Sequence, residues 1–194
     1  MNIQTPPSED NSGHPSMEVK ENKPEQSDQN RQILEVIKLA HREMDLPHRE
    51  YRGAILAPLA LKDFGSELIS WVDPQGLCVL VLPVVSDIAP ERRQAVGELL
   101  HRLDFRETRK LWEFDYNSGD VRLTAYTDVL TITSDTQAYK DLIDLIKTTA
   151  DVVYPYLTAV LSAKMAPDFA ADQANAALAV AFNSGPEDFE DDDE

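Results

Sequence analysis

The chain has 194 residues, of which 42% are apolar and 27% are charged, with 18 basic and 35 acidic side chains. This length predicts one domain with tails, and the formal charge of −17 opposes general affinity for DNA, RNA or anionic lipid, because like charges repel. The sequence has neither an apolar run of the ~18–20 residues that span a bilayer nor the basic start and apolar core of a secretory signal. The single cysteine, Cys78, excludes an intrachain disulfide. We therefore expect a cytoplasmic protein without membrane insertion.

The acidic charge is concentrated at the two ends of the chain. Residues 1–28 carry six acids and two bases, residues 165–194 carry nine acids and no base, and the stretch between them is nearly balanced, with 20 acids and 16 bases. Such ends cannot bury enough apolar area to offset the entropy of ordering. We predict a disordered acidic tail over residues 1–28 and a folded domain over residues 29–164. Residues 165–194 should form an alanine-rich segment, with a marginal helix detached from the core, and then a disordered acidic tail.

Apolar residues at helical spacing predict three helices within the domain. The first runs from about residue 28 to Met44, and the second begins at Pro90 and ends near Asp104. Ser134 and Gln137 have the spacing of a capping box and open a long third helix. Its apolar stripe continues past Pro155, so we expect a kink there and no break.

Strand patterns alternate with these helices. Residues 67–82 predict a hairpin around a Pro–Gly turn, with its second strand buried on both faces. Residues 112–125 predict another hairpin, whose turn contains Gly119 at a left-handed position. Residues 51–61 are interrupted by Gly53 and Pro58 and predict an irregular strand or a loop. The order predicts an α+β fold, in which an antiparallel sheet of two hairpins is packed by helices.

Two segments of this domain resemble a known family. Residues 111–122 (LWEFDYNSGDVR) pair an aromatic and acidic strand with a G-x-V-R return, and residues 150–160 (ADVVYPYLTAV) place an acid before an aromatic–Pro pair and an aliphatic tail. Over residues 30–164 the chain resembles the bacterial YbjN family. The resemblance implies a type III secretion chaperone-like fold and a role as a regulator of sensory transduction. Because that family has no established catalytic residues, the resemblance implies no enzymatic activity.

Motifs that carry chemistry are missing from the sequence. The glycines come no closer than eleven positions, so neither G-x-G-x-x-G nor the P-loop can be written, and G-x-S-x-G is absent as well. Cys78 lies in an aliphatic strand and is expected to be a small buried hydrophobe. His41 and His48 could serve as metal ligands, but we favour the interpretation that they lie at a solvated helix end. We predict no catalytic residue, no metal and no cofactor.

Two surfaces are candidates for interaction. Because one sheet can cover only one side of the long third helix, we expect a homodimer that uses residues 142–161, an edge strand, or both. The candidate partner or dimer surface comprises Trp112, Phe114, Tyr116, Leu142, Val153, Tyr156, Leu157 and Val160. A second candidate is a basic patch for an anionic partner or for the protein's own acidic tail, comprising Arg92, Arg93, Arg102, Arg106, Arg109 and Lys110. The alternative for the basic patch is a solvated helix face.

Two function classes stay open at this point. The first is a non-enzymatic regulator or chaperone-like protein that docks a partner polypeptide, which suits a motif-free domain with solubilising tails. The second is a small-molecule-sensing domain or an enzyme whose site is built from dispersed residues. Binding of a metabolite would raise the stability of the native state and would distinguish the second class from the first.

Overall fold

The computed structural model describes residues 24–103, 110–128, 131–132 and 136–183, which form an α+β fold, as predicted. All pairings in its six-stranded sheet are antiparallel, and the strand order is β1-β2-β3-β4-β6-β5. The strands are β1 (Arg49–Tyr51), β2 (Ala54–Ala60), β3 (Gly65–Val72), β4 (Leu77–Val85), β5 (Lys110–Asp115) and β6 (Asp120–Asp128). The helices are α1 (Pro24–Glu43), α2 (Pro90–Leu103), α4 (Thr136–Leu161) and α5 (Pro167–Asn183).

Both predicted hairpins are present, as β3–β4 and β5–β6, and they join where β4 pairs with β6. The sheet is larger than predicted because residues 49–60 add the hairpin β1–β2. Its two-residue turn places Arg52 at φ 51° and Gly53 at φ 79°, the left-handed pair that a tight hairpin requires. Arginine is an unusual residue at such a position, so the sequence does not reveal this turn.

The strand β2 is regular although Pro58 lies inside it. The pairing with β1 stops at Leu56, so among the described strands Pro58 has a neighbour on one side only, in β3. An edge position tolerates a residue that has no backbone N–H to donate. The prediction of an irregular strand or loop over residues 51–61 is therefore wrong for Ala54–Ala60.

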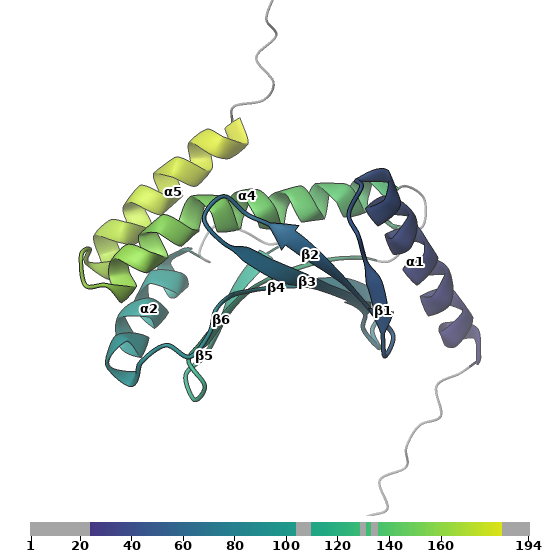
Figure 1. Ribbon diagram of the computed structural model, residues 1–194, viewed down its shortest axis with the longest axis horizontal. Coiled ribbons are helices and arrows are strands. Elements are labelled where there is room, and N and C mark those ends of the chain that lie inside the picture. Colours follow the sequence, from purple (N-terminus) through teal and green to yellow (C-terminus); the bar gives the residue numbers. More distant parts are fainter. Residues whose placement is uncertain (1–23, 104–109, 129–130, 133–135, 184–194) are drawn as a thin grey trace, which may run out of the picture.

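The hydrophobic core lies between one face of the sheet and the helices. The long helix α4 crosses that face, α1 packs beside it over β2 and β3, and α2 packs on β5 at the other end (Figure 1). From α1 the buried residues Ile33, Ile37 and Ala40 enter the core, at the helical spacing read from the sequence. The helix α4 continues through Pro155 to Leu161 without a break, as predicted.

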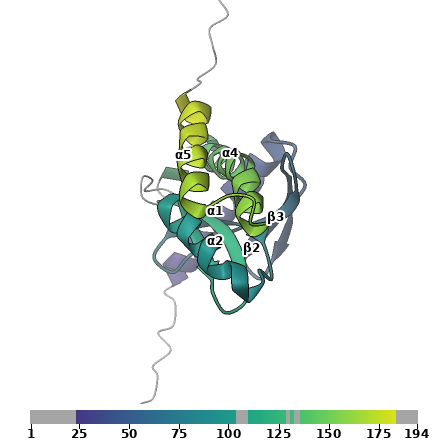
Figure 2. The same ribbon diagram turned by 90° about the vertical axis from the view of Figure 1, so that its left-hand side faces the viewer.

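The alanine-rich segment is part of this core. The helix α5 packs against α4 and α2 (Figure 2) and buries Ala170, Ala171, Ala174 and Leu178. Small side chains let the α5 backbone approach α4 closely, which compensates for the scarcity of large apolar groups. The prediction of a detached helix is wrong, because α5 belongs to the packed body. Residues 24–28 of the predicted N-terminal tail lie in α1, and the remaining parts of the two predicted tails, 1–23 and 184–194, lie outside the described residues.

Two turns are fixed to helices by specific contacts. At the β2–β3 turn, the Phe64 ring stacks on Tyr154 with 4.2 Å between centroids, and the Asp151 carboxylate accepts a 2.7 Å hydrogen bond from the N–H of Lys62. At the β5–β6 turn, the Arg93 guanidinium donates to the carbonyls of residues 116, 117 and 118 at 2.7, 2.8 and 3.3 Å. The turns are thereby tied to α4 and α2, respectively.

Candidate partner-binding surface

The second face of the sheet carries no described helix and is largely apolar. Side chains alternate between the two faces of a strand, so the pairing register identifies the residues that share this second face. One row contains Tyr51, Ala54, Trp71, Val79 and Tyr126, and the adjacent row contains Leu56, Ile69, Val81, Thr124, Leu111 and, at its β1 end, the charged Arg49. We call the ten residues other than Arg49 the open face.

Four large side chains of the open face are accessible to solvent, whereas Leu56 and Val81 are buried. The exposed fractions are 53% for Tyr51, 44% for Leu111 and 40% for Tyr126, and Trp71 is partly exposed. An antiparallel sheet with one face in water ordinarily presents polar residues there. An exposed apolar surface of this kind marks a site of interaction with another molecule.

Two ion pairs lie on the same side of the sheet as the open face. Arg49 forms a 2.8 Å ion pair with Glu67, and Arg122 forms a 2.9 Å ion pair with Glu113 toward the opposite edge of the sheet. Within the face itself Thr124 is buried among larger neighbours, and its hydroxyl has no hydrogen-bond partner. The surface is therefore suited to an apolar partner of low net charge.

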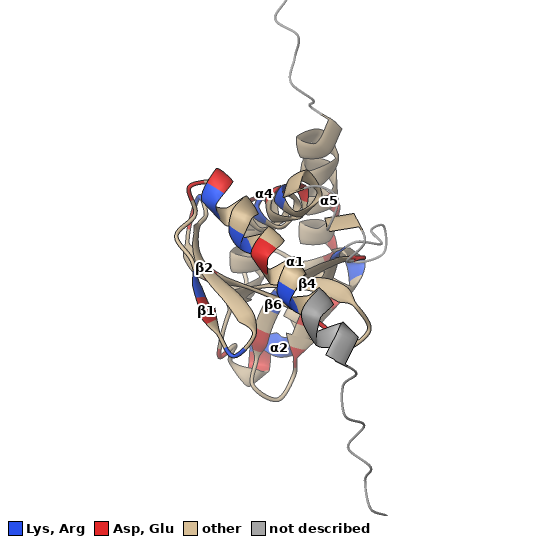
Figure 3. Cartoon of the chain, turned by 90° about the vertical axis from the view of Figure 1, so that its right-hand side faces the viewer, with Lys and Arg blue, Asp and Glu red and all other residues tan. Residues whose placement is uncertain are grey.

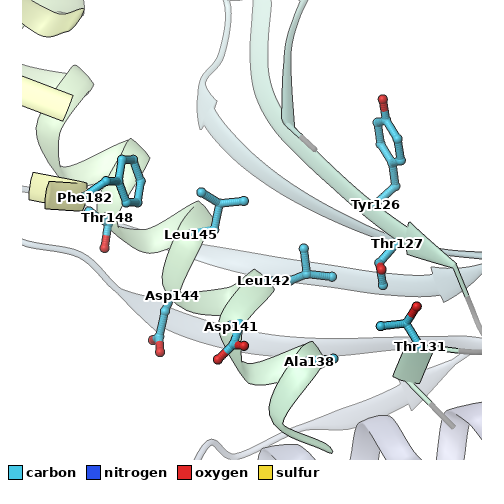
Figure 4. Close-up of a pocket in the computed structure, with 10 residues that line it drawn as sticks. All are labelled: Tyr126, Thr127, Thr131, Ala138, Asp141, Leu142, Asp144, Leu145, Thr148 and Phe182. Carbon is cyan, nitrogen blue, oxygen red and sulfur yellow. The ribbon is translucent and has the colours of Figure 1, made fainter. Parts of the chain in front are cut away.

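A groove lies next to the open face, between α4, the end of β6 and the last turn of α5. Its volume is about 680 Å³, and we call it the α4–β6 groove. The residues that line it are Tyr126, Thr127, Thr131, Ala138, Asp141, Leu142, Asp144, Leu145, Thr148 and Phe182 (Figure 4). Tyr126 belongs to both surfaces, so the groove continues from the edge of the open face.

The groove has an apolar interior and an acidic margin. Leu142 and Leu145 point from α4 toward β6, whereas the carboxylates of Asp141 and Asp144 point away from it (Figure 4). The ring of Phe182, 44% exposed, forms the wall on the α5 side.

A buried lysine supports that wall. The Lys110 ammonium lies 5.1 Å from the centroid of the Phe182 ring and donates a 3.0 Å hydrogen bond to the Thr149 hydroxyl. A cation over an aromatic face is attracted by the ring quadrupole. This contact helps to fix Phe182 at the end of α5.

The polar groups inside the core form a short chain. The Tyr139 hydroxyl lies 2.9 Å from Nε2 of His41 and 2.7 Å from the Ser70 hydroxyl, and all three residues are buried. Burial, with a smaller contribution from His48, lowers the pKa of His41 to about 4, so its imidazole is neutral near pH 7. Burial likewise raises the pKa of Tyr139 and that of the Cys78 thiol, the latter to about 12. The side chains of His41, Tyr139 and Cys78 are therefore all uncharged near pH 7.

The histidines differ from the solvated helix end that the sequence predicts. His41 is fully buried, and its ring lies edge-on to His48 with 5.2 Å between centroids. Among the described residues no three His, Cys, Asp or Glu side chains gather as a metal-binding group. The sequence gives no signal for the burial of His41, because its hydrogen-bond partner Tyr139 lies 98 residues away.

Most of the predicted partner or dimer surface lies inside the protein. Trp112, Leu142, Val153, Leu157 and Val160 are buried, Phe114 and Tyr156 are partly buried, and only Tyr116 is well exposed, at 57%. The sheet and α1 cover part of α4, and α5 covers more of it. The buried residues of this set are therefore covered within the chain and do not need a second copy to cover them, while the homodimer itself stays a prediction.

The predicted basic patch is dispersed by other contacts. Arg93 holds the β5–β6 turn, Lys110 is buried, and Arg102 pairs with Glu98 at 2.9 Å. Arg92 is partly buried on α2, while Arg106 and Arg109 lie outside the described residues. On the α1 side of the molecule, basic and acidic positions are interspersed as well (Figure 3). For Arg93 and Lys110, the assignment to an exposed anion-binding patch is wrong.

The open face is the feature that sequence reasoning missed. The signal was the continuous aliphatic run of β4, where Val79 and Val81 alternate with Cys78, Leu80 and Leu82. We interpreted that run as a strand buried on both faces. Cys78, Leu80 and Leu82 face the core, and on the other face Val81 is buried as expected, whereas Val79 is only partly covered.

Comparisons with known proteins do not extend this picture. Within the described part of the chain, no helix is long and apolar enough to cross a membrane. No family model matches the chain, and no curated protein or solved structure shows significant similarity to it.

Proposed function

We propose that this chain is a non-enzymatic binding protein of the cytoplasm, which docks a segment of a partner polypeptide on the open face. The observation that carries the proposal is the apolar row of Tyr51, Trp71, Val79 and Tyr126 on a sheet face that no described helix covers. The resemblance of residues 30–164 to the YbjN family supports a regulatory or chaperone-like role for such binding.

The chemistry of the open face indicates the kind of segment that it accepts. Its flanking charges, Arg49 with Glu67 and Arg122 with Glu113, are already paired within the chain, so a charged partner gains little from them. Apolar side chains of a partner that are transferred from water onto Trp71 and Ile69 gain about 25 cal/mol per Å² of buried apolar surface. The expected occupant is therefore an apolar segment of low net charge from another protein.

The test uses peptides selected from a random library on the immobilised full chain. Binding is followed by the fluorescence of Trp71 in a Trp112→Phe background, so that the whole tryptophan signal of the protein comes from the open face. We expect the selected peptides to be apolar and uncharged and to lose at least tenfold in affinity in Ile69→Lys. The matched control is Leu39→Lys on α1, whose leucine is 41% exposed outside the open face. Equal affinities for both variants would reject the proposal.

A second copy of the chain is the competing occupant of the open face. Light scattering at micromolar concentration distinguishes the two. A mass near 21.7 kDa supports a face that is free for a partner, whereas a doubled mass that Ile69→Lys returns to 21.7 kDa assigns the face to a homodimer and overturns the proposal.

A small-molecule sensor or a dispersed-site enzyme is the alternative, and the α4–β6 groove favours it. Its volume of about 680 Å³ lies within the roughly 300–1,000 Å³ of ordinary ligand pockets. A metabolite that binds there should raise the melting temperature of the wild type and not that of Leu145→Ser. That result would favour the alternative without depending on the open face.

A further inference from the structure

The charges around the α4–β6 groove have one sign. Asp141 and Asp144 are the only ionised side chains among the described residues that line it. Asp141 accepts a 2.8 Å hydrogen bond from the Gln137 side chain, which orients its carboxylate. Lys110, the cation over the Phe182 ring, is buried and donates to Thr149. The groove thus combines an apolar interior with an acidic margin.

The sequence adds further negative charge at the same place. Phe182, the wall of the groove, is followed after one residue by residues 184–194, which contain seven acids and no base; the last base of the chain is Lys164. Eleven residues reach at most about 40 Å from Asn183, since an extended chain spans ~3.3–3.6 Å per residue. These seven charges therefore lie within about 40 Å of Asn183, which follows Phe182 directly.

The protein's own acidic end is a poor occupant of this groove. Phe189 is its only aromatic residue, and it stands between acids on both sides. Bringing it to Leu142 and Leu145 would place its flanking acids beside Asp141 and Asp144 without a base to compensate them. Like charges that lie within the Debye length of about 8 Å repel each other. The complementary occupant carries positive charge.

We propose that the α4–β6 groove is a second docking surface, which binds a basic amphipathic segment of a partner polypeptide. Apolar side chains of that segment contact Leu145 and Phe182 above the nearly covered Leu142, and its Lys or Arg side chains face Asp141 and Asp144. The acidic residues 184–194 attract the segment and raise its association rate. This surface acts independently of the open face, so either proposal stands if the other fails.

The experiment measures the binding of three 18-residue helical peptides with the same leucine pattern and with lysine, glutamate or glutamine on the polar face. Fluorescence anisotropy is recorded with the full chain at about 50 and 300 mM salt. We expect the lysine peptide to bind at least tenfold more tightly than the other two at low salt, and to lose most of that advantage at high salt. Equal binding of the three peptides would overturn the proposal.

Matched variants locate the binding on the protein. The double variant Asp141→Asn, Asp144→Asn should lower the affinity for the lysine peptide at least tenfold. The control Asp63→Asn, Asp172→Asn removes the same charge from exposed positions outside the groove and should change that affinity less than twofold. Equal losses in the two double variants would mean that only net charge matters and would overturn the site. All four positions are exposed, so the variants retain the fold.

A truncation after Asn183 separates the partner from the protein's own end. Loss of residues 184–194 should weaken the lysine peptide and flatten its salt dependence. Tighter binding after truncation would show that the acidic end occupies the groove, which would contradict the proposal. Leu145→Ser tests the apolar contribution and should weaken the glutamine and lysine peptides by the same factor; loss for the lysine peptide alone would contradict the apolar contact.

Discussion

The hydroxyl of Tyr139 on α4 lies 2.9 Å from Nε2 of His41 on α1, in a part of the core that water does not reach. The same hydroxyl lies 2.7 Å from Ser70 on β3, so one oxygen atom joins two helices to the sheet. Buried polar groups are costly unless each has a partner. This chain of contacts therefore fixes the position of α1 relative to α4.

Replacement of Tyr139 by Phe should destabilise the protein. The change keeps the ring and leaves His41 and Ser70 without their shared partner, which costs about 1–3 kcal/mol in the free energy of unfolding. Urea denaturation measures the loss. The control is Tyr154→Phe, because the ring of Tyr154 stacks on Phe64 and the substitution preserves that stack. A larger effect in the control than in Tyr139→Phe would contradict the role of the buried hydroxyl.

The stability of the fold should fall as the pH drops from 6.5 toward 4. The native pKa of His41 is about 4, below its ordinary value of 6.5, so in this window the unfolded chain binds a proton that the native state excludes. The free energy of unfolding then decreases by up to about 1.4 kcal/mol per pH unit. Denaturation at several pH values measures the slope, and NMR titration assigns it to His41.

The control for this pH dependence is His101→Gln, since His101 is exposed on α2. The variant should show the same decrease between pH 6.5 and 5 as the wild type. Several carboxyl groups also have lowered pKa values, among them Glu35 beside Lys38, Glu43 beside Lys140, and Asp115 in the β5–β6 turn. Their contributions are lost only as the pH falls below about 4.5. A native His41 pKa near 6.5 would contradict the assignment.

Gly119→Ala should destabilise the β5–β6 turn. Gly119 has φ 83°, and an added Cβ would lie 2.6 Å from both the N and the O of Ile88, whose N–H donates to the Gly119 carbonyl. Backbone atoms cannot move away as a flexible side chain can, so we expect a cost of about 1–3 kcal/mol. Thermal denaturation measures it. Gly65→Ala is the control, because nothing lies within 4 Å of its added Cβ and its φ is not left-handed.

Removal of α5 should lower the melting temperature by many degrees. A chain that stops after Ala166 loses the contacts of Ala170, Ala174 and Leu178 with α4 and α2 and exposes the apolar surface beneath them. The matched control stops after Asn183 and keeps the helix. Calorimetry compares both with the full chain. Equal melting temperatures for the two truncated chains would show that the packing of α5 contributes nothing to stability.

The periodic segments made most of the fold predictable. The turns Pro74–Gly76 and Asn117–Asp120 lie within a few residues of the strands that they join, and both hairpins were identified from them. The hairpin β1–β2 was missed because its turn uses Arg52 at a left-handed φ. The docking of α5 was missed because the close approach of alanines depends on where α4 and α2 lie, which no local pattern encodes.

The candidate sites were less predictable, because exposure depends on neighbours that are distant in sequence. Leu142 and Tyr126 come together in the groove only through the sheet order, in which β6 lies beside β4. Likewise Lys110, which reads as part of a basic run, faces inward because it pairs with Ala125 on the core side of β6. The charge of a side chain can be read from the sequence, but the face of the sheet on which the side chain lies depends on the strand register.

The proline in β2 limits how this protein can polymerise. Fibrils that grow by strand addition need two open edges on every subunit, so that each copy both receives and offers a strand. On this side of the sheet β1 is only three residues long and carries Arg49 and Glu50, and beyond it Pro58 interrupts the donors of β2. A short, charged border backed by a proline is a poor template for strand addition, so we expect the sheet not to propagate across this edge.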